Sequence, residues 1–218
     1  MVRFVFLFTV LIPGFFACQS ATKHDDAAEA EAVLSLQTAE ILQNPDRETD
    51  PEKVTRLKEA LTTLGGETYI QDLGKQIFND SLGVVDEVAA KKYLDACEAY
   101  AIVNKGSESA ADYLYKASET VRAMHAPERC IQIYDRIMKD YPHSKRASQS
   151  LFLKGFTYDN DLKDYTRAKV CYEEFLQKYP EDEFAGSATF LLENLGKSDD
   201  ELLEVLQHKS QEQHADVQ

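Results

Sequence analysis

Two stretches of the chain carry the same pattern of apolar positions, 38 residues apart. Within each stretch the apolar positions lie three, four, seven, eight and eleven residues after the first, which places their side chains on one stripe of an α-helix. The first set is Cys130, Ile133, Tyr134, Ile137, Met138 and Tyr141, and the second is Ala168, Cys171, Tyr172, Phe175, Leu176 and Tyr179. Each copy is followed by a proline, Pro142 or Pro180. The pattern predicts one amphipathic helix that occurs twice.

The same period extends toward the amino terminus and includes a second helix in each unit. A degenerate copy of the stripe lies at about Asp86 to Val103. The second helix is marked by small residues at intervals of 37 and 38, namely Ala110, Ala147 and Ala185, together with Ser118 and Gly155. A small residue lets two helices approach closely. One apolar stripe per helix at this period predicts an all-α helical-repeat solenoid over residues 86–209, because such units bury their faces by stacking on neighbours.

One unit resembles the tetratricopeptide repeat. The pattern of that family, a large residue, glycine, tyrosine, alanine, an aromatic residue and proline, is met in order by Leu151, Gly155, Tyr158, Ala168, Tyr172 and Pro180. Lys154 departs from the pattern, since leucine is usual there. The resemblance implies a right-handed, TPR-like solenoid of about three units that binds a protein or peptide partner.

The turns between units are also similar to those of two families of Gram-negative envelope proteins. Tyr141-Pro142-x-Ser144-x₂-Ala147 and its copy starting at Tyr179 resemble the longer repeats of outer-membrane assembly lipoproteins of the BamD type and of the Tol-Pal coordinator. This resemblance implies a place in the bacterial cell envelope.

Residues 1–17 differ in composition from the rest and predict a lipoprotein signal peptide. Arg3 precedes an apolar run from Phe4 to Ile12 that is too short to span a bilayer. Phe15 occupies the position where ordinary cleavage needs a small residue. Residues 15–18 instead resemble a lipobox, which implies that Cys18 carries two or three acyl chains, enough for a stable anchor. A plain secreted protein or a misread start is the alternative.

The lipid anchor predicts a protein of the outer membrane, on its periplasmic face, with residues 18–26 as a polar tether. Residues 27–85 are expected to form an N-terminal helical region. Its first helix, Ala27 to Gln43, is either an oligomerising coiled coil or a helix that docks on the repeats. Further helices are expected at Pro51 to Leu64 and across Ile70 to Phe78.

The carboxyl end is expected to close the solenoid. Ser198 and Glu201 have the spacing of a capping box, which predicts a short terminal helix that covers the last repeat. Residues 210–218 are expected as a disordered tail.

Charge and cysteine content argue against nucleic-acid binding, electrostatic docking on lipid and a zinc site. The net charge is −14, from 24 basic and 38 acidic residues, which disfavours nucleic acid and electrostatic docking on anionic lipid. Cys97, Cys130 and Cys171 all fall on predicted helix stripes and have no zinc-site spacing. Buried free thiols are expected for them, and a disulfide between two is the alternative.

The sequence contains no recognised catalytic motif. Asp159-Asn160-Asp161 resembles the start of a calcium loop, but Val170 stands where the bidentate glutamate belongs, so a polar turn is expected. We therefore predict a non-enzymatic protein without cofactor or metal. The leading hypothesis is an envelope adaptor, with outer-membrane protein assembly as a candidate process. The alternative is an oligomeric spacer that links the outer membrane to cell-wall or division machinery.

One aromatic residue recurs at the same helical phase in each unit, and Phe156 extends the row. The candidate partner-binding groove is formed by Tyr115, Phe152, Phe156 and Phe190. Such rings serve as anchors for a peptide. The alternative is that they pack as core between helices.

Overall fold

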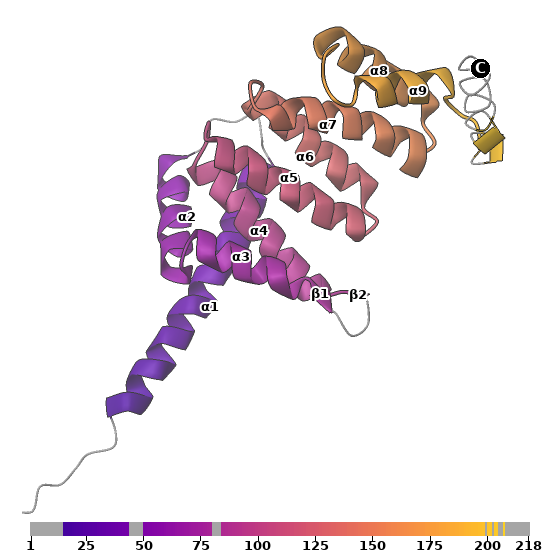
Figure 1. The fold of residues 1–218 in the computed structure, drawn as a ribbon. Helices are drawn as coiled ribbons and strands as arrows, with labels where there is room; N and C mark the ends of the chain where they lie inside the picture. The colour runs from indigo at the N-terminus through magenta and orange to yellow at the C-terminus, as the bar shows by residue number, and fades with distance from the viewer. Residues whose placement is uncertain are drawn as a thin grey trace, which may run out of the picture.

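The computed structural model is an array of packed α-helices (Figure 1). It describes residues 15–43, 50–79, 84–198, 200, 201, 203, 204 and 207, and the side chains of residues 15–24, 78, 79 and 84 lie outside this description. The first elements are α1 (Phe15–Leu42), α2 (Pro51–Leu64), α3 (Glu67–Gln76) and the strands β1 (Phe78–Asn79) and β2 (Val84–Val85). The remaining elements are α4 (Glu87–Val103), α5 (Glu108–Ala123), α6 (Pro127–Asp140), α7 (Lys145–Phe156), the π-helical turn η1 (Thr157–Asp161), α8 (Tyr165–Lys178) and α9 (Ala185–Glu193).

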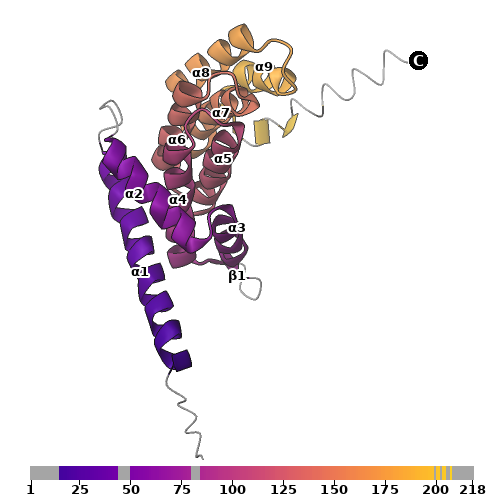
Figure 2. The ribbon, with the colours of Figure 1, turned by 90° about the vertical axis from the view of Figure 1, so that its left-hand side faces the viewer.

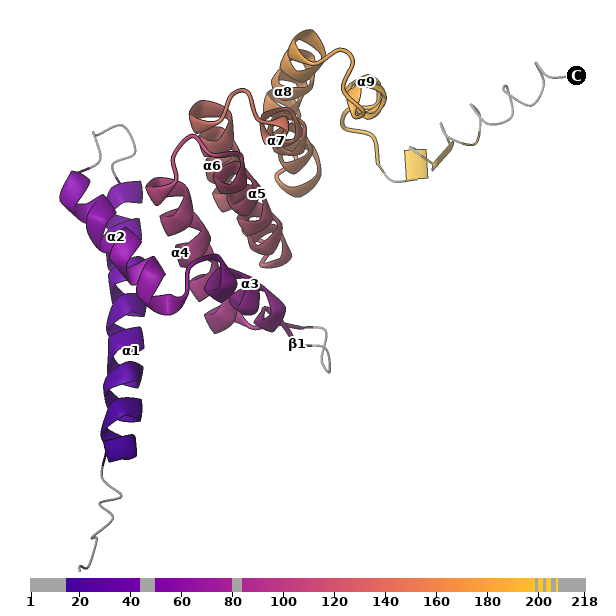
Figure 3. The same ribbon diagram turned by 60° about the vertical axis from the view of Figure 1, so that its left-hand side comes forward.

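The helices form two rows, as the repeat pattern predicts. Each helix from α4 to α9 packs against the next in sequence. In Figure 3, α3, α5, α7 and α9 form one row, called the inner row below, and α4, α6 and α8 form the other. α1 and α2 lie at one end, on the side away from the inner row (Figure 2). The expected all-α, TPR-like helical repeat is confirmed in the described part of the chain.

α1 docks on the array through its carboxyl-terminal half. Ala30, Leu34 and Thr38 lie four residues apart, on one stripe, and all three are buried. α1 packs against α2 and α4, while its amino-terminal half projects beyond the other helices (Figure 1). This contact confirms the docking interpretation for that half of α1. The helix begins at Phe15, well before the expected Ala27, so residues 18–26 are helical.

α2 has the predicted bounds because both of its caps are local. The Asp50 side chain accepts a hydrogen bond from the Glu52 N–H at 2.9 Å, and Pro51 occupies the first turn. At the other end Gly65 adopts φ 104°, a left-handed conformation that costs glycine little. The Gly66 N–H then donates to the Leu61 carbonyl at 2.7 Å.

The segment after α3 differs from the expected helix across Ile70 to Phe78. α3 ends at Gln76, and β1 pairs antiparallel with β2, so that Phe78 lies opposite Val85. The Asp86 N–H donates to the Ile77 carbonyl at 2.7 Å, and Ile77 is buried. A short ladder replaces the last helical turn because β-branched and aromatic residues favour strand pairing.

The two turns between units have almost the same backbone. Tyr141 ends α6 with φ −134° and ψ 53°, and Tyr179 ends α8 with φ −132° and ψ 55°. The Ser144 hydroxyl accepts from the Arg146 N–H, and the Asp182 carboxylate accepts from the Phe184 N–H at 3.0 Å. The sequence period therefore corresponds to a repeated three-dimensional unit.

Close packing inside each unit depends on small residues. A Cβ atom at Gly155 would lie 2.8 Å from the Tyr172 ring and 3.2 Å from Cys171. Tyr134 and Tyr172, at equivalent positions of α6 and α8, are fully buried. Gly155 is thus required where α7 crosses α8, as the sequence predicts.

The three cysteines on the helix stripes are free and buried, as expected. Burial raises the pKa of both the Cys130 and the Cys171 thiol to about 11. Burial also raises the pKa of Cys97. These thiols are neutral and pack as small apolar side chains.

The acidic segment at Asp159 lies in η1, at the turn between α7 and α8 where the sequence predicts a polar connection. The Tyr172 hydroxyl is 3.4 Å from Asp159, and Lys163 adopts φ 53° before Asp164 caps α8. Within the described residues, no three His, Cys, Asp or Glu side chains are arranged to hold a metal ion. No helix of this part of the chain is long and apolar enough to cross a membrane.

The predicted capping box at the carboxyl end is formed. The Ser198 N–H donates to Glu201 Oε2 at 2.7 Å, and the Glu201 N–H donates to the Ser198 hydroxyl at 3.4 Å. Leu203 is 55% exposed. The other apolar residues of the expected cap, Leu202, Val205 and Leu206, lie outside the described residues, as do the expected tail and residues 1–14. Coverage of the last repeat by this segment stays a prediction.

Candidate partner-binding face

The four predicted groove residues all belong to the inner row (Figure 3). Tyr115 lies on α5, Phe152 and Phe156 on α7, and Phe190 on α9. Phe152 is buried, whereas the other three are half-buried. The periodicity therefore placed them on the correct row, but they do not share one environment.

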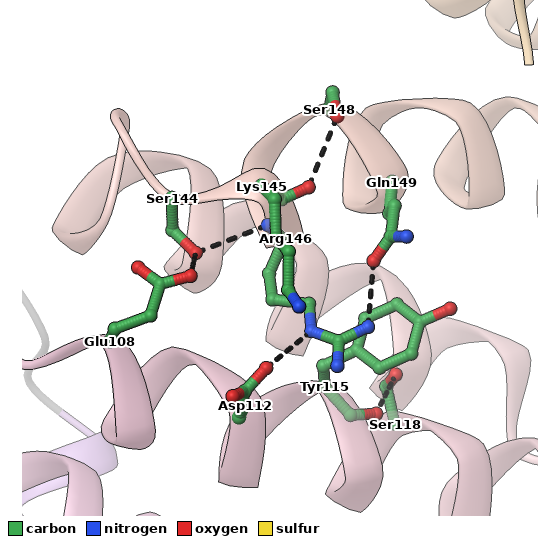
Figure 4. Close-up of polar contacts among 9 residues, drawn as sticks. All are labelled: Glu108, Asp112, Tyr115, Ser118, Ser144, Lys145, Arg146, Ser148 and Gln149. Carbon is green, nitrogen blue, oxygen red and sulfur yellow. Dashed lines mark hydrogen bonds and ion pairs between the residues drawn. The ribbon is translucent and has the colours of Figure 1, made fainter. Parts of the chain in front are cut away.

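Tyr115 is covered by an arginine from the next unit (Figure 4). The Arg146 guanidinium lies 4.3 Å from the centre of the Tyr115 ring. Arg146 Nε is 2.5 Å from Asp112 Oδ1, and Nη1 donates to Gln149 Oε1 at 2.8 Å. The three contacts orient the guanidinium, whose side chain is only 19% exposed. Burial, with a further contribution from Glu119, raises the pKa of Tyr115, so the ring stays neutral beneath the cation.

One further hydrogen bond joins α5 to the residue that caps α7, and a second lies within α5, beside this arginine (Figure 4). The Ser144 hydroxyl donates to Glu108 at 2.7 Å, across the two helices. The Ser118 hydroxyl donates to the Tyr115 carbonyl at 2.6 Å, within α5. The inner face between α5 and α7 thus presents an ordered set of charged and polar groups rather than an open aromatic groove.

For Phe152 the groove interpretation is wrong, because the ring belongs to the core. Only 8% of Phe152 is exposed. Its ring stacks on Phe184 with centroids 4.9 Å apart and packs against Tyr172 and Phe175 at 6.1 and 5.7 Å. The turn that precedes α9 closes over the ring, so a partner cannot reach it without opening this contact.

Phe156 and Phe190 remain as candidate anchors. Both are half-buried and lie on α7 and α9 of the inner row. Burying the remaining surface of an aromatic ring against a partner is favourable. The candidate partner-binding face is therefore defined here by Phe156, Phe190 and the polar groups around Arg146.

Sequence reasoning missed Arg146 and Phe184, although a signal for both was present. Each follows a Tyr-Pro turn at the same place, four residues after the proline, and each covers the ring that the preceding inner helix carries. The period of apolar residues does not reveal that the two positions are equivalent, because one holds a charged arginine and the other an apolar phenylalanine.

An ion pair explains why a lysine, Lys154, occupies a position where the repeat pattern has leucine. Its ammonium group donates to Asp135 of α6 at 2.6 Å. Burial would lower the pKa of Lys154, but Asp135 outweighs this effect and the pKa is raised. A lysine can therefore replace leucine here because Asp135 pairs with its charge.

Cys18, the predicted lipid attachment site, belongs to α1, and its side chain lies outside the described part of the structure. Attachment of lipid to Cys18 stays a prediction from the sequence.

Comparison with protein families identifies one repeat. Residues 149–182, which comprise most of α7, all of α8 and the following turn, match the model of the tetratricopeptide repeat. Comparison with curated proteins and with solved structures gave no match. The matched unit contains Phe152 and Phe156, and the preceding unit has the same turn geometry.

Proposed function

We propose that this tetratricopeptide-repeat protein is a non-enzymatic adaptor that binds a protein or peptide partner on the inner row. Tetratricopeptide repeats generally act as scaffolds for protein–protein interaction, and the matched unit contributes α7 to the inner row. The observation that carries the proposal is the pair of half-buried rings, Phe156 and Phe190, on the same row of helices as the ordered charged groups around Arg146. Apolar anchors with a polar surround are the usual composition of such an interface.

Site-specific photocrosslinking in cells tests this adaptor function. A photoreactive phenylalanine analogue at Phe156 or Phe190 is expected to give the same discrete adduct. Val170 on α8 is the matched control, because it is apolar and 57% exposed but lies outside the inner row. An adduct at Val170 identical to those at the inner positions, or none at either inner position, would contradict the proposal.

The proposed location in the cell rests mainly on the sequence of the amino terminus. We propose that Cys18 is acylated and anchors the chain in the bacterial outer membrane, where it serves protein assembly on the periplasmic face. The support is the lipobox-like sequence before Cys18 and the similarity of the Tyr-Pro turns to envelope proteins. Metabolic labelling with a clickable palmitate is expected to mark wild type but not Cys18→Ser. Labelling that persists in Cys18→Ser would contradict lipid attachment at Cys18.

A second candidate function is the oligomeric spacer, which the exposed surface of α1 favours. Leu36 is 69% exposed, opposite the stripe that docks on α2 and α4. An α1 seam between copies would bury this residue. Light scattering at micromolar concentration distinguishes the two functions. The adaptor predicts a monomer for wild type and for Leu36→Glu, whereas the spacer predicts an oligomer that Leu36→Glu dissociates.

A further inference from the structure

A hollow lies on the side of the array away from the inner row. It has a volume of about 440 Å³ and is formed by the end of α1, by α4 and by α6. Its apolar lining is provided by Ile41, Leu42, Ala101, Ile102 and Ile133. This volume falls within the range of small-molecule sites, about 300–1,000 Å³.

The hollow is rich in cations although the chain as a whole is strongly acidic. α6 places Arg129, Gln132 and Arg136 on one stripe, three and seven residues apart. Lys105 and Lys139 also line the hollow. Four cationic side chains thus line it together with three carboxylates, Glu98, Asp135 and Asp140.

The hollow contains four cationic groups and three carboxylates, and each of these carboxylates takes part in an ion pair. Glu98, whose side chain is 5% exposed, forms an ion pair with Arg129. Asp135 pairs with Lys154, which lies outside the hollow. Asp140 is 3.5 Å from Arg136 Nε and 4.0 Å from Lys105 Nζ. Burial raises the pKa of Glu98, although Arg129 and Arg136 oppose this effect.

Arg136 carries the most direct sign of a missing ligand. Its Nη1 is buried, and no acceptor among the described residues lies within hydrogen-bonding distance. A buried cationic donor without an acceptor is costly. A guanidinium is well suited to a carboxylate, which it can bind through two parallel hydrogen bonds.

We propose that this hollow binds a small organic carboxylate that carries an apolar group. Arg136 binds the carboxylate, and Leu42, Ile102 and Ile133 contact the apolar group. The site is separate from the partner-binding face, because α1, α4 and α6 form it. Two sources share this chemistry, a free aliphatic acid and the carboxyl terminus of a peptide.

Isothermal titration of the purified chain tests the site with octanoate, N-acetyl-leucine and octanamide. One of the two acids is expected to bind, and octanamide, which lacks the charge, is expected to bind at least tenfold more weakly. Binding of octanoate alone identifies a free acid as the source, whereas binding of N-acetyl-leucine identifies a peptide terminus. The proposal is overturned if neither acid binds or if octanamide binds as well as octanoate does.

Arg136→Gln is expected to lower the binding affinity for the acid at least tenfold. Arg56→Gln is the matched control, since Arg56 is 55% exposed on α2 and pairs with Glu52, and it should leave the affinity unchanged. If Arg136→Gln fails to fold, methyl spectra of the wild-type chain still test the site. In ¹³C-methyl isoleucine spectra the acid should shift Ile41, Ile102 and Ile133 but not Ile70, which is buried on α3. Unchanged affinity in Arg136→Gln, or no shift at these three methyl groups, contradicts the assignment.

Discussion

The Arg146 guanidinium lies 4.3 Å from the centre of the Tyr115 ring, across the contact between α5 and α7. The corresponding pair in the next unit is Phe152 and Phe184, whose rings stack with centroids 4.9 Å apart. In both places a residue from the start of the following inner helix, or from the turn just before it, covers the ring. At Tyr115 and Phe152 the recurring aromatic position is therefore a contact between units, and Phe156 and Phe190 stay the candidate residues for contact with a partner.

The first prediction concerns the core position of Phe152. Phe152→Ala should lower the free energy of unfolding by about 3–5 kcal/mol, because it removes a buried ring and leaves a cavity. Phe156→Ala is the matched control on the same helix and should cost less than half as much, since Phe156 is only half-buried. Urea unfolding followed by circular dichroism measures both. Equal losses in the two variants would show that the rings do not differ in burial.

The second prediction uses two helical glycines in different surroundings. Gly155→Ala should destabilise the chain by about 1–3 kcal/mol, because its Cβ would lie 2.8 Å from the Tyr172 ring. Gly186→Ala has the opposite expected sign, since nothing lies within 4 Å of its Cβ and alanine favours a helix by up to about 1 kcal/mol. Thermal unfolding of both variants checks the signs. A stabilised Gly155→Ala would mean that α7 and α8 are not in close contact at this point.

The third prediction is a pH dependence from Glu98. Its folded pKa is raised by burial above the ordinary value of 4.5, so the folded chain takes up a proton at higher pH than the unfolded chain does. The stability contribution of Glu98 therefore increases as the pH falls through the raised pKa toward the ordinary value. The difference in unfolding free energy between wild type and Glu98→Gln should shift in favour of wild type from about pH 8 to about pH 5. Parallel stability curves over this range would show that the pairing with Arg129 cancels the effect of burial.

The fourth prediction concerns the three buried thiols. In Cys18→Ser, a thiol reagent at about pH 8 should react slowly with the folded chain, because burial raises the pKa of Cys130 and of Cys171 to about 11 and blocks access. After unfolding without reductant, three thiols should react, matching the three free cysteines. Detection of only one reactive thiol would reveal a disulfide, and rapid reaction of the folded chain would contradict the burial.

Local signals in the sequence predicted some elements more accurately than others. The bounds of α2 were predicted correctly because Asp50 and Gly65 cap the helix through residues next to it. The sequence places the start of α1 too late because Asp25 and Asp26, residues that favour an N-cap, precede Ala27, whereas the helix begins at Phe15 and runs through them. The β1–β2 ladder was missed because its pairing depends on a neighbouring segment rather than on local periodicity.

The candidate site was harder to predict than the fold. Periodicity placed Tyr115 and Phe152 on the same row, but it does not distinguish a ring that faces a groove from one that faces the core. Their environments depend on Arg146 and Phe184, which lie more than 30 positions away in sequence. Only the folded contact between successive units shows that both rings are covered.

The matching backbone angles of Tyr141 and Tyr179 have a consequence for how the array can grow. Residues 142–179 form a block that begins after one such tyrosine and ends on the next. Inserting a second copy of this block would join Tyr179 to Pro142, a junction equivalent to the native Tyr179-Pro180. The chain thus contains a modular cassette, and its duplication would lengthen the scaffold by one helical pair without requiring a new type of turn.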